Sequence, residues 1–200
     1  MDYTKIDKKS VLKWLELNLS PSRLSHSIGC AQTAAELAKI YGLNEKIAYI
    51  TGLLHDCAKC FKNEDMIEII KTHMPEVDEC EILSHKTLHA PVSAYVARTE
   101  FGVEDEEILS SIRWHTLGKM DMTDFEKIIF LADKIEPNTR DSVYREEILK
   151  TLEQENGLNK ALLICYKETI KSLVKRNLKI CVPTIEIYNQ LLDKKPRSCE

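Results

Sequence analysis

Apolar residues recur along most of the chain with the three- to four-residue spacing of amphipathic helices, while glycine and proline fall mostly between the periodic segments. This pattern predicts an all-α protein, a helical bundle in a single domain. The expected helices follow Ser10, span Ser20 to Gly42, run from Asn44 into residues 52–59, and cover 64–74, a stretch from near His89, 104–116, 123–136, about 142–174, and a last segment after Pro183.

Several of these helices carry candidate chemistry, among them the second helix and the helix over 123–136. Ser20 is a good N-cap for the second helix, with Pro21 at its first position, and Arg23 and His26, three residues apart, share one of its faces. The helix over 123–136 has a capping box at its start and is apolar nearly all round, which indicates that it is buried. Asp133 lies within it and is expected to be buried as well.

The octapeptide GLLHDCAK, residues 52–59, places His55 and Asp56 side by side at the inner end of an apolar segment. Buried ionisable groups are costly unless they are paired or bind a metal. Taken alone, Asp133 could pair with a buried arginine or lysine, and a lone histidine such as His26 or His73 is more often an ordinary core or surface residue.

Pro91 decides which of two nearby histidines is the better candidate. A proline fits the first turn of a helix and breaks its interior, so the helix is expected to begin near His89 or Ala90. His85 and His89 would act as joint metal ligands only on one continuous helix. We therefore favour His89 and assign His85 to the surface.

Histidines and aspartates at the ends or inner faces of different helices form the main candidate site. Helices packed as a bundle could bring them together, and imidazoles with carboxylates are ligands of catalytic divalent metals. The joint pattern favours a metal over separate structural roles. Its members are His26, His55, Asp56, His89, His115 and Asp133.

Composition narrows the range of possible binding partners. The chain has 200 residues, a formal net charge of -4 and a pI near 5.9, so it lacks the basic footprint of a nucleic-acid-binding protein. It lacks the run of roughly 18 apolar residues needed to span a membrane, and its start does not resemble a secretion signal. We expect a cytoplasmic protein with a small-molecule partner. The seven cysteines are expected to be free thiols, with the pair Cys57 and Cys60 packed in the core.

Four segments carry a resemblance to a known family: RLSH at 23–26, GLLHDCAK at 52–59, LHAPVSA at 88–94, and IRWHTLGKMDMTDFEKIIFLADKIEPNTR at 112–140. With the order H, HD and D, they are similar to the YqeK-type HD proteins. These bacterial symmetrical bis(5'-nucleosyl)-tetraphosphatases hydrolyse diadenosine tetraphosphate to two ADP. The resemblance implies an HD metal-dependent phosphohydrolase domain over 20–190, preceded by an N-terminal helix in 1–19 and followed by a tail over 191–200.

The resemblance also implies roles for single residues. An iron site is implied at His26, His55, Asp56 and Asp133, although the residue types alone would suit iron, manganese, cobalt or zinc. The resemblance further implies that the nucleotide phosphates are contacted by six residues: Arg23, Lys59, His89, His115, Thr116 and Arg140. Arg176, with Lys175 and Lys179, either closes the pocket or belongs to a solvated face.

Asp56, His89 and His115 are the catalytic candidates. His89 or His115 could protonate the leaving phosphate or hold a second metal. The expected ligands are a dinucleoside polyphosphate and the product ADP or GDP, and the oligomeric state, a homodimer included, stays open. One departure from the family, Cys181-Val182-Pro183-Thr184, affects the fine structure of the nucleotide pocket.

Two other functions remain compatible with this pattern. Another HD phosphohydrolase, acting on a deoxynucleotide or a cyclic dinucleotide, would keep the metal ligands and change the pocket. A non-enzymatic helical module that senses a nucleotide would require a broken metal site, whereas all of its expected members are present.

Overall fold

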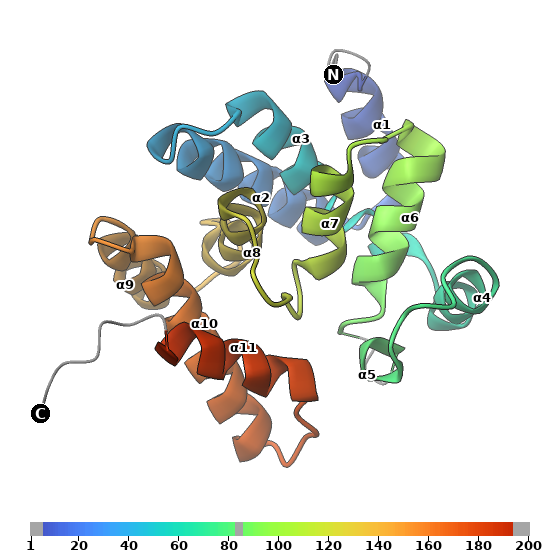
Figure 1. Cartoon of the computed structure of the whole chain (residues 1–200). Coiled ribbons are helices and arrows are strands. Elements are labelled where there is room, and N and C mark those ends of the chain that lie inside the picture. The colour runs from blue at the N-terminus through green and yellow to red at the C-terminus, as the bar shows by residue number, and fades with distance from the viewer. Residues whose placement is uncertain (1–5, 83–85, 194–200) are drawn as a thin grey trace, which may run out of the picture.

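The computed structural model describes residues 6–82 and 86–193, and this part of the chain contains helices and no strand, which confirms the predicted all-α fold (Figure 1). The elements are α1 (Lys8–Asn18), α2 (Pro21–Ile40), α3 (Glu45–Leu54), the short 3-10 helix η2 (Cys57–Cys60), α4 (Asn63–His73), α5 (Glu79–Ile82), α6 (His89–Phe101), α7 (Glu106–Trp114), α8 (Asp124–Ile135), α9 (Ser142–Leu152), α10 (Gly157–Lys175) and α11 (Val182–Asp193).

Local sequence signals account for the starts of the helices that carry the candidate site. The Ser20 hydroxyl accepts the Arg23 N–H at the start of α2. Thr123 and Glu126 form the predicted capping box at the start of α8. Helix α6 begins at His89, as the position of Pro91 required. His85 lies outside the described residues.

Several boundaries differ from the prediction. Helix α1 begins at Lys8 because Asp7, ahead of Ser10, is the N-cap. The segment 142–174 is divided into α9 and α10 by the left-handed residue Asn156. Helix α11 continues to Asp193, and Leu191 is buried. Residues 191–193 therefore belong to this helix, although the sequence placed them in a tail over 191–200.

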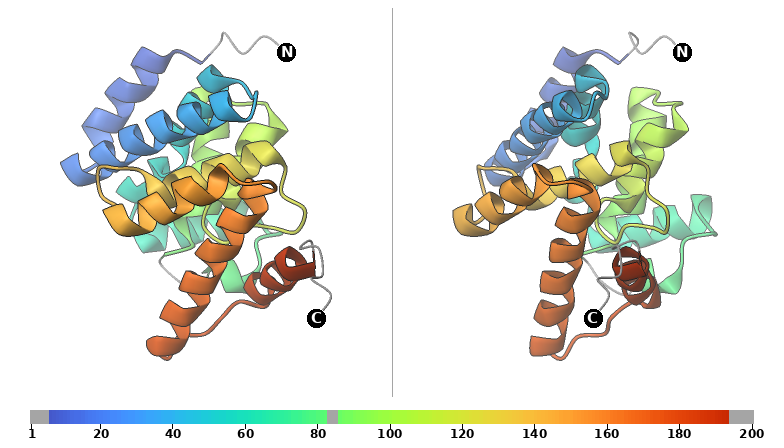
Figure 2. Two further views of the ribbon diagram at one scale, coloured as in Figure 1. Left: turned by 90° about the vertical axis from the view of Figure 1, so that its left-hand side faces the viewer. Right: turned by 60° about the vertical axis from the view of Figure 1, so that its left-hand side comes forward.

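Two buried apolar clusters hold the bundle together. One joins α2 and α8 to α9, α10 and α11, and the other joins α1, α3, α4, α6 and α7. Helix α8 is buried on almost every side, as its sequence predicted, and Figure 2 shows it running through the middle of the molecule. Each large apolar side chain buried this way contributes about 1.5–3 kcal/mol. The candidate residues of α2, α3 and α8 therefore stand on helices that are packed into these buried clusters.

Gly52 sets the spacing between α2 and α3. A Cβ atom at this position would lie 2.6 Å from the Cα of Ala31, so only glycine allows the two helix backbones to approach this closely. His55 follows three residues later. The close packing therefore brings the end of α3 against the face of α2 that carries His26.

The cysteines behave as expected in part. Cys30, Cys57, Cys60 and Cys165 are free thiols. Cys57 is buried, but Cys60 is exposed, so core packing is confirmed for only one member of the pair. Cys181 is disulfide-bonded, and the expectation of free thiols is wrong there. Among the described residues, no helix has the length and apolar character to cross a membrane.

Candidate active site

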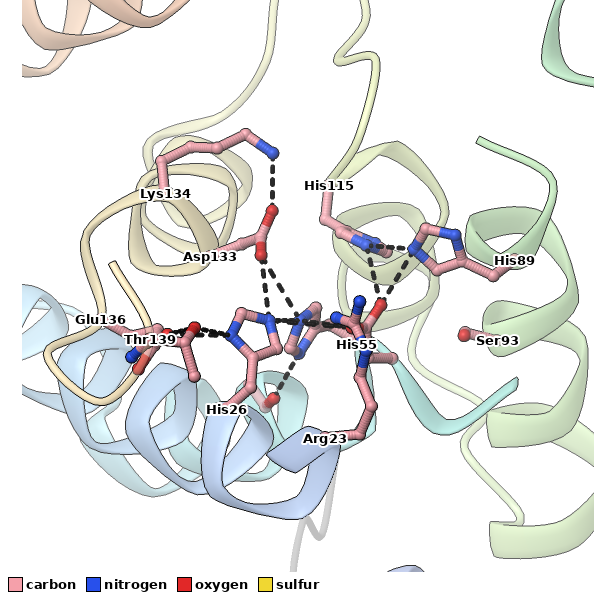
Figure 3. Close-up of polar contacts among 12 residues, drawn as sticks. Arg23, His26, His55, His89, Ser93, His115, Asp133, Lys134, Glu136 and Thr139 are labelled. Atoms are coloured by element: carbon pink, nitrogen blue, oxygen red, sulfur yellow. Dashed lines mark hydrogen bonds and ion pairs between the residues drawn. The ribbon is translucent and has the colours of Figure 1, made fainter. Parts of the chain in front are cut away.

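Six buried side chains from five helical segments meet at the centre of the molecule (Figure 3). His26 comes from α2 and His55 from the end of α3, with Asp56 directly after it; His89 begins α6, His115 caps α7, and Asp133 lies in the last turn of α8. Each of these residues is 6% exposed or less. The predicted convergence is therefore confirmed.

His26, His55 and Asp56 form a first group whose ligand atoms lie within 4.8 Å of one another. The Nε2 atoms of His26 and His55 are 3.2 Å apart, and His26 Nε2 lies 3.1 Å from Asp133 Oδ1. The Nδ1–H of His55 donates to the Gly52 carbonyl, which leaves its Nε2 lone pair directed at His26. Two such nitrogens facing each other require a proton or a cation between them. The arrangement therefore fits a metal ligand set.

His89, His115 and Asp56 form a second group. His89 Nε2 lies 2.9 Å from Asp56 Oδ1 and 3.0 Å from His115 Nε2. The Nδ1–H of His115 donates to the Ile112 carbonyl, so its Nε2 also points inward. Because Asp56 directs Oδ2 toward the first group and Oδ1 toward the second, this carboxylate connects them.

Burial and neighbouring charges set the protonation of the site. Burial lowers the pKa of His55 to about 3 and that of His89 to about 4, so both are held in the neutral form that binds metals. Burial alone would raise the pKa of Asp56, but the adjacent histidines hold it well below its usual value. For Asp133, Lys134 and His26 outweigh burial in the same way, and the pKa of this carboxyl is also lowered.

Basic side chains surround the two carboxylates. Arg23 lies 3.1 Å from Asp56, and Asp133 is 2.6 Å from Lys134 and 2.7 Å from Arg140. Asp133 is therefore both a candidate ligand and the ion-pair partner that the sequence left as an alternative. The side chains of Arg23 and Arg140 stay 46% and 36% exposed, so both can also reach an anion from solvent.

A cavity of about 1380 Å³ opens over these groups. Its lining includes every residue that the sequence predicted to bind phosphate: Arg23, Lys59, His89, His115, Thr116, Arg140 and Arg176. The opposite wall is formed by α10 and the turn into α11, with Lys179 and the aromatic residues Tyr144 and Tyr166. Residues 181–184, where the sequence departs from the family pattern, also belong to this wall.

Comparison with known proteins identifies the family. The HD domain model matches residues 23–138. The chain belongs to the HD-domain family. It is of the YqeK type, because it is 38% identical over 190 residues to a Bacillus subtilis protein and 37% identical over 187 residues to a Halalkalibacterium halodurans protein. Both relatives are named symmetrical bis(5'-nucleosyl)-tetraphosphatase, and each match covers 94% of this chain and 98% of the relative.

A solved structure has the same architecture as this HD-domain protein. It is a Clostridium acetobutylicum protein described as a predicted HD superfamily hydrolase involved in NAD metabolism. The two chains are 35% identical, the TM-score is 0.88, and the match covers 94% of this chain and 98% of the other. The helical framework around the site is therefore that of the family.

Sequence reasoning missed two side chains of the HD-domain site. Lys134 contacts Asp133, and its position directly after that aspartate was the available signal. Glu136 lies 3.0 Å from His26 Nδ1 and is fully buried, but it follows the end of α8, where helical periodicity gives no information. The HD domain of this chain thus contains a third carboxylate that the pattern did not indicate.

Proposed function

We propose that this HD-domain protein hydrolyses dinucleoside tetraphosphates symmetrically and converts diadenosine tetraphosphate to two ADP. One observation carries the proposal: buried histidine and aspartate ligand groups lie directly beneath a large cavity bordered by arginine and lysine side chains. The named activity of the two relatives that match nearly the whole chain supports the same reaction.

A divalent metal is implied by the HD domain, and we propose iron, held by His26, His55, Asp56 and Asp133. The facing Nε2 atoms of the two histidines and the flanking carboxylate oxygens suit such an ion. When bound, the metal would lower the pKa of a coordinated water and so supply a nucleophile at neutral pH. The chain fixes these ligands through helices packed in the core.

The substrate carries several negative charges, which repel a nucleophile unless cations offset them. Arg23, Lys59 and Arg140 line the cavity beside the proposed metal ligands. We propose that they hold two phosphates of one nucleoside half. This arrangement would direct attack to the second phosphate and produce two equal halves. Thr116 and Arg176 are proposed to contact the rest of the substrate.

His89 and His115 are proposed to act on the leaving phosphate. Both line the cavity, and His89 contacts Asp56 through Nε2. A proton at this atom would be well placed for transfer to the leaving group. The same atoms would serve a second metal, and an experiment that counts bound metal per chain separates the two roles.

The cytoplasmic location and a homodimer stay predictions.

Product analysis tests the proposed function. Iron-loaded protein is incubated with diadenosine tetraphosphate, and the nucleotides are separated by ion-exchange chromatography. We expect ADP as the only product, and none from the His55→Ala variant. Formation of AMP with ATP would contradict the symmetric register. Turnover of a deoxynucleotide or a cyclic dinucleotide, with none of the tetraphosphate, would favour the other HD phosphohydrolase.

A further inference from the structure

The four histidines of the site differ in the hydrogen-bond partner of one ring nitrogen, the one that faces away from the centre of the site. His55 and His115 donate their Nδ1–H to backbone carbonyls, and His89 Nδ1 has no partner among the described residues. His26 alone directs Nδ1 at a carboxylate, that of Glu136, at 3.0 Å. Figure 3 shows Glu136 on the side of the His26 ring opposite the other histidines.

Glu136 is itself held in place by the loop that follows α8. The Asn138 N–H donates to its Oε2 at 2.7 Å, the Thr139 N–H donates to its Oε1 at 3.0 Å, and the Thr139 hydroxyl donates to Oε1 as well. Both oxygens of Glu136 therefore accept hydrogen bonds from fixed donors. This geometry assigns the proton in the contact with His26 to Nδ1, with the carboxylate as the acceptor.

Helix α2 leaves a space shaped for this carboxylate. A Cβ atom on Gly29 would lie 2.5 Å from Glu136 Oε2 and 2.9 Å from Asn138 Nδ2. Gly29 follows His26 by three residues, so both belong to the same face of α2. The Asn138 side chain also donates to the Ser25 carbonyl at 2.7 Å, which ties the loop to the helix. Two independent features, a glycine and a loop, therefore place Glu136 against His26.

We propose that Glu136 is a positioning residue that fixes His26 as the Nδ1–H tautomer, with its Nε2 lone pair directed at the proposed metal. A carboxylate that accepts the outer N–H of a ligating histidine also raises the basicity of the inner nitrogen, and loss of such a partner commonly weakens metal binding by 10- to 100-fold. His26 is therefore the most firmly oriented and the strongest donor of the four histidines. The inference rests on the metal site of the proposed function but not on its substrate.

A purely structural role for Glu136, limited to holding the loop after α8, predicts a different result. It would lower stability when Glu136 is changed but would leave the affinity of the folded protein for metal unaltered. Glu126 offers a matched control, because it is also a buried carboxylate with backbone and side-chain donors, at the start of the same helix and outside the site. Glu126→Gln should cost stability alone.

The test compares metal affinities of folded, metal-free proteins by titration with cobalt(II). We expect the Kd to rise by about 10- to 100-fold in Glu136→Gln and to change by less than about 2-fold in Glu126→Gln. Glu136→Asp, which keeps the charge, should recover part of the affinity. Gly29→Ala, which displaces the carboxylate without removing it, should weaken binding in the same direction.

A second measurement reports on His26 directly. In zinc-loaded protein, the Nδ1–H proton of His26 should resonate downfield of those of His55 and His115, because only the first of these three Nδ1–H groups donates to a carboxylate. In Glu136→Gln this proton should move upfield while the other two stay in place. Unchanged cobalt affinity and an unchanged His26 resonance in Glu136→Gln would overturn the inference. Absence of metal binding by the wild-type protein would instead contradict the proposed metal site.

Discussion

The two ligand groups that share Asp56 are held in different ways. In the first, His26 and His55 lie beneath the cavity lining, and each donates its outer N–H to a fixed acceptor. In the second, His89 and His115 line the cavity, and the outer nitrogen of His89 has no partner among the described residues. We interpret the first group as a permanent metal site and the second as the part that handles protons beside the substrate.

Removal of the shared carboxylate should have the largest effect. Asp56→Ala takes a ligand from the first group and the contact partner of His89 from the second. We expect loss of bound metal and a fall in kcat of about 1000-fold or more, because no coordinated water is then activated. Metal analysis and steady-state kinetics on one preparation measure both effects. Full metal occupancy in this variant would show that Asp56 is not a ligand.

His89→Ala should separate the two groups. If His89 handles a proton and does not bind the metal, the variant keeps its metal, while kcat falls by about 100-fold or more. The measurement is again metal content alongside kcat. Loss of about half of the bound metal would contradict this division and favour a second metal at His89 and His115.

Arg140→Ala should weaken the substrate contact with a smaller effect. A charge-assisted contact of a guanidinium to phosphate contributes about 1.5–3 kcal/mol, so kcat/KM should fall by about 10- to 150-fold. Arg176→Ala, at the far wall of the cavity, provides the comparison and should cost less. Metal content should stay unchanged in both variants. Wild-type kinetics for Arg140→Ala would place that arginine outside the substrate site.

Acidification should destabilise the metal-free protein before its carboxylates titrate. His55 and His89 have lowered pKa values in the folded state, about 3 and about 4, against 6.5 for an unperturbed histidine. At a pH below 6.5, these two histidines bind protons in the unfolded chain but not in the folded chain. The free energy of unfolding therefore falls as the pH falls, by about 2 kcal/mol for each residue at pH 5. For His26, burial is outweighed by Asp133 and Glu136, so its pKa is raised and its contribution, lost at high pH, partly offsets the fall.

Thermal unfolding of metal-free protein from about pH 7 to about pH 5 checks this pH dependence. The Tm should drop across this range. The drop should be smaller in His89→Gln, because glutamine at position 89 cannot take up a proton when the chain unfolds. An unchanged Tm between these two pH values would mean that the two buried histidines are protonated in the folded protein.

The sequence predicted the site wherever polar residues interrupt an apolar pattern. His55, Asp56 and Asp133 stand out because they lie in segments that are otherwise buried, and Pro91 placed the start of α6 at His89. Periodicity and caps likewise predicted the helices. Glu136 escaped detection because it lies past the end of α8 in a non-helical backbone conformation, where its burial depends on a tertiary contact with Gly29. The break at Asn156 has a local cause, because Asn156 adopts a left-handed backbone directly before Gly157 and Asn-Gly is a turn signal.

Stoichiometric reconstitution tests whether His26, His55, Asp56 and Asp133 bind the metal that hydrolysis requires. Metal-free protein is titrated with iron(II) under anaerobic conditions, and bound iron and ADP formation are measured on the same samples. We expect activity on diadenosine tetraphosphate to rise in proportion to bound iron, and we expect His55→Ala to gain neither iron nor activity. Full activity in the metal-free protein, or wild-type iron binding by His55→Ala, would contradict this expectation.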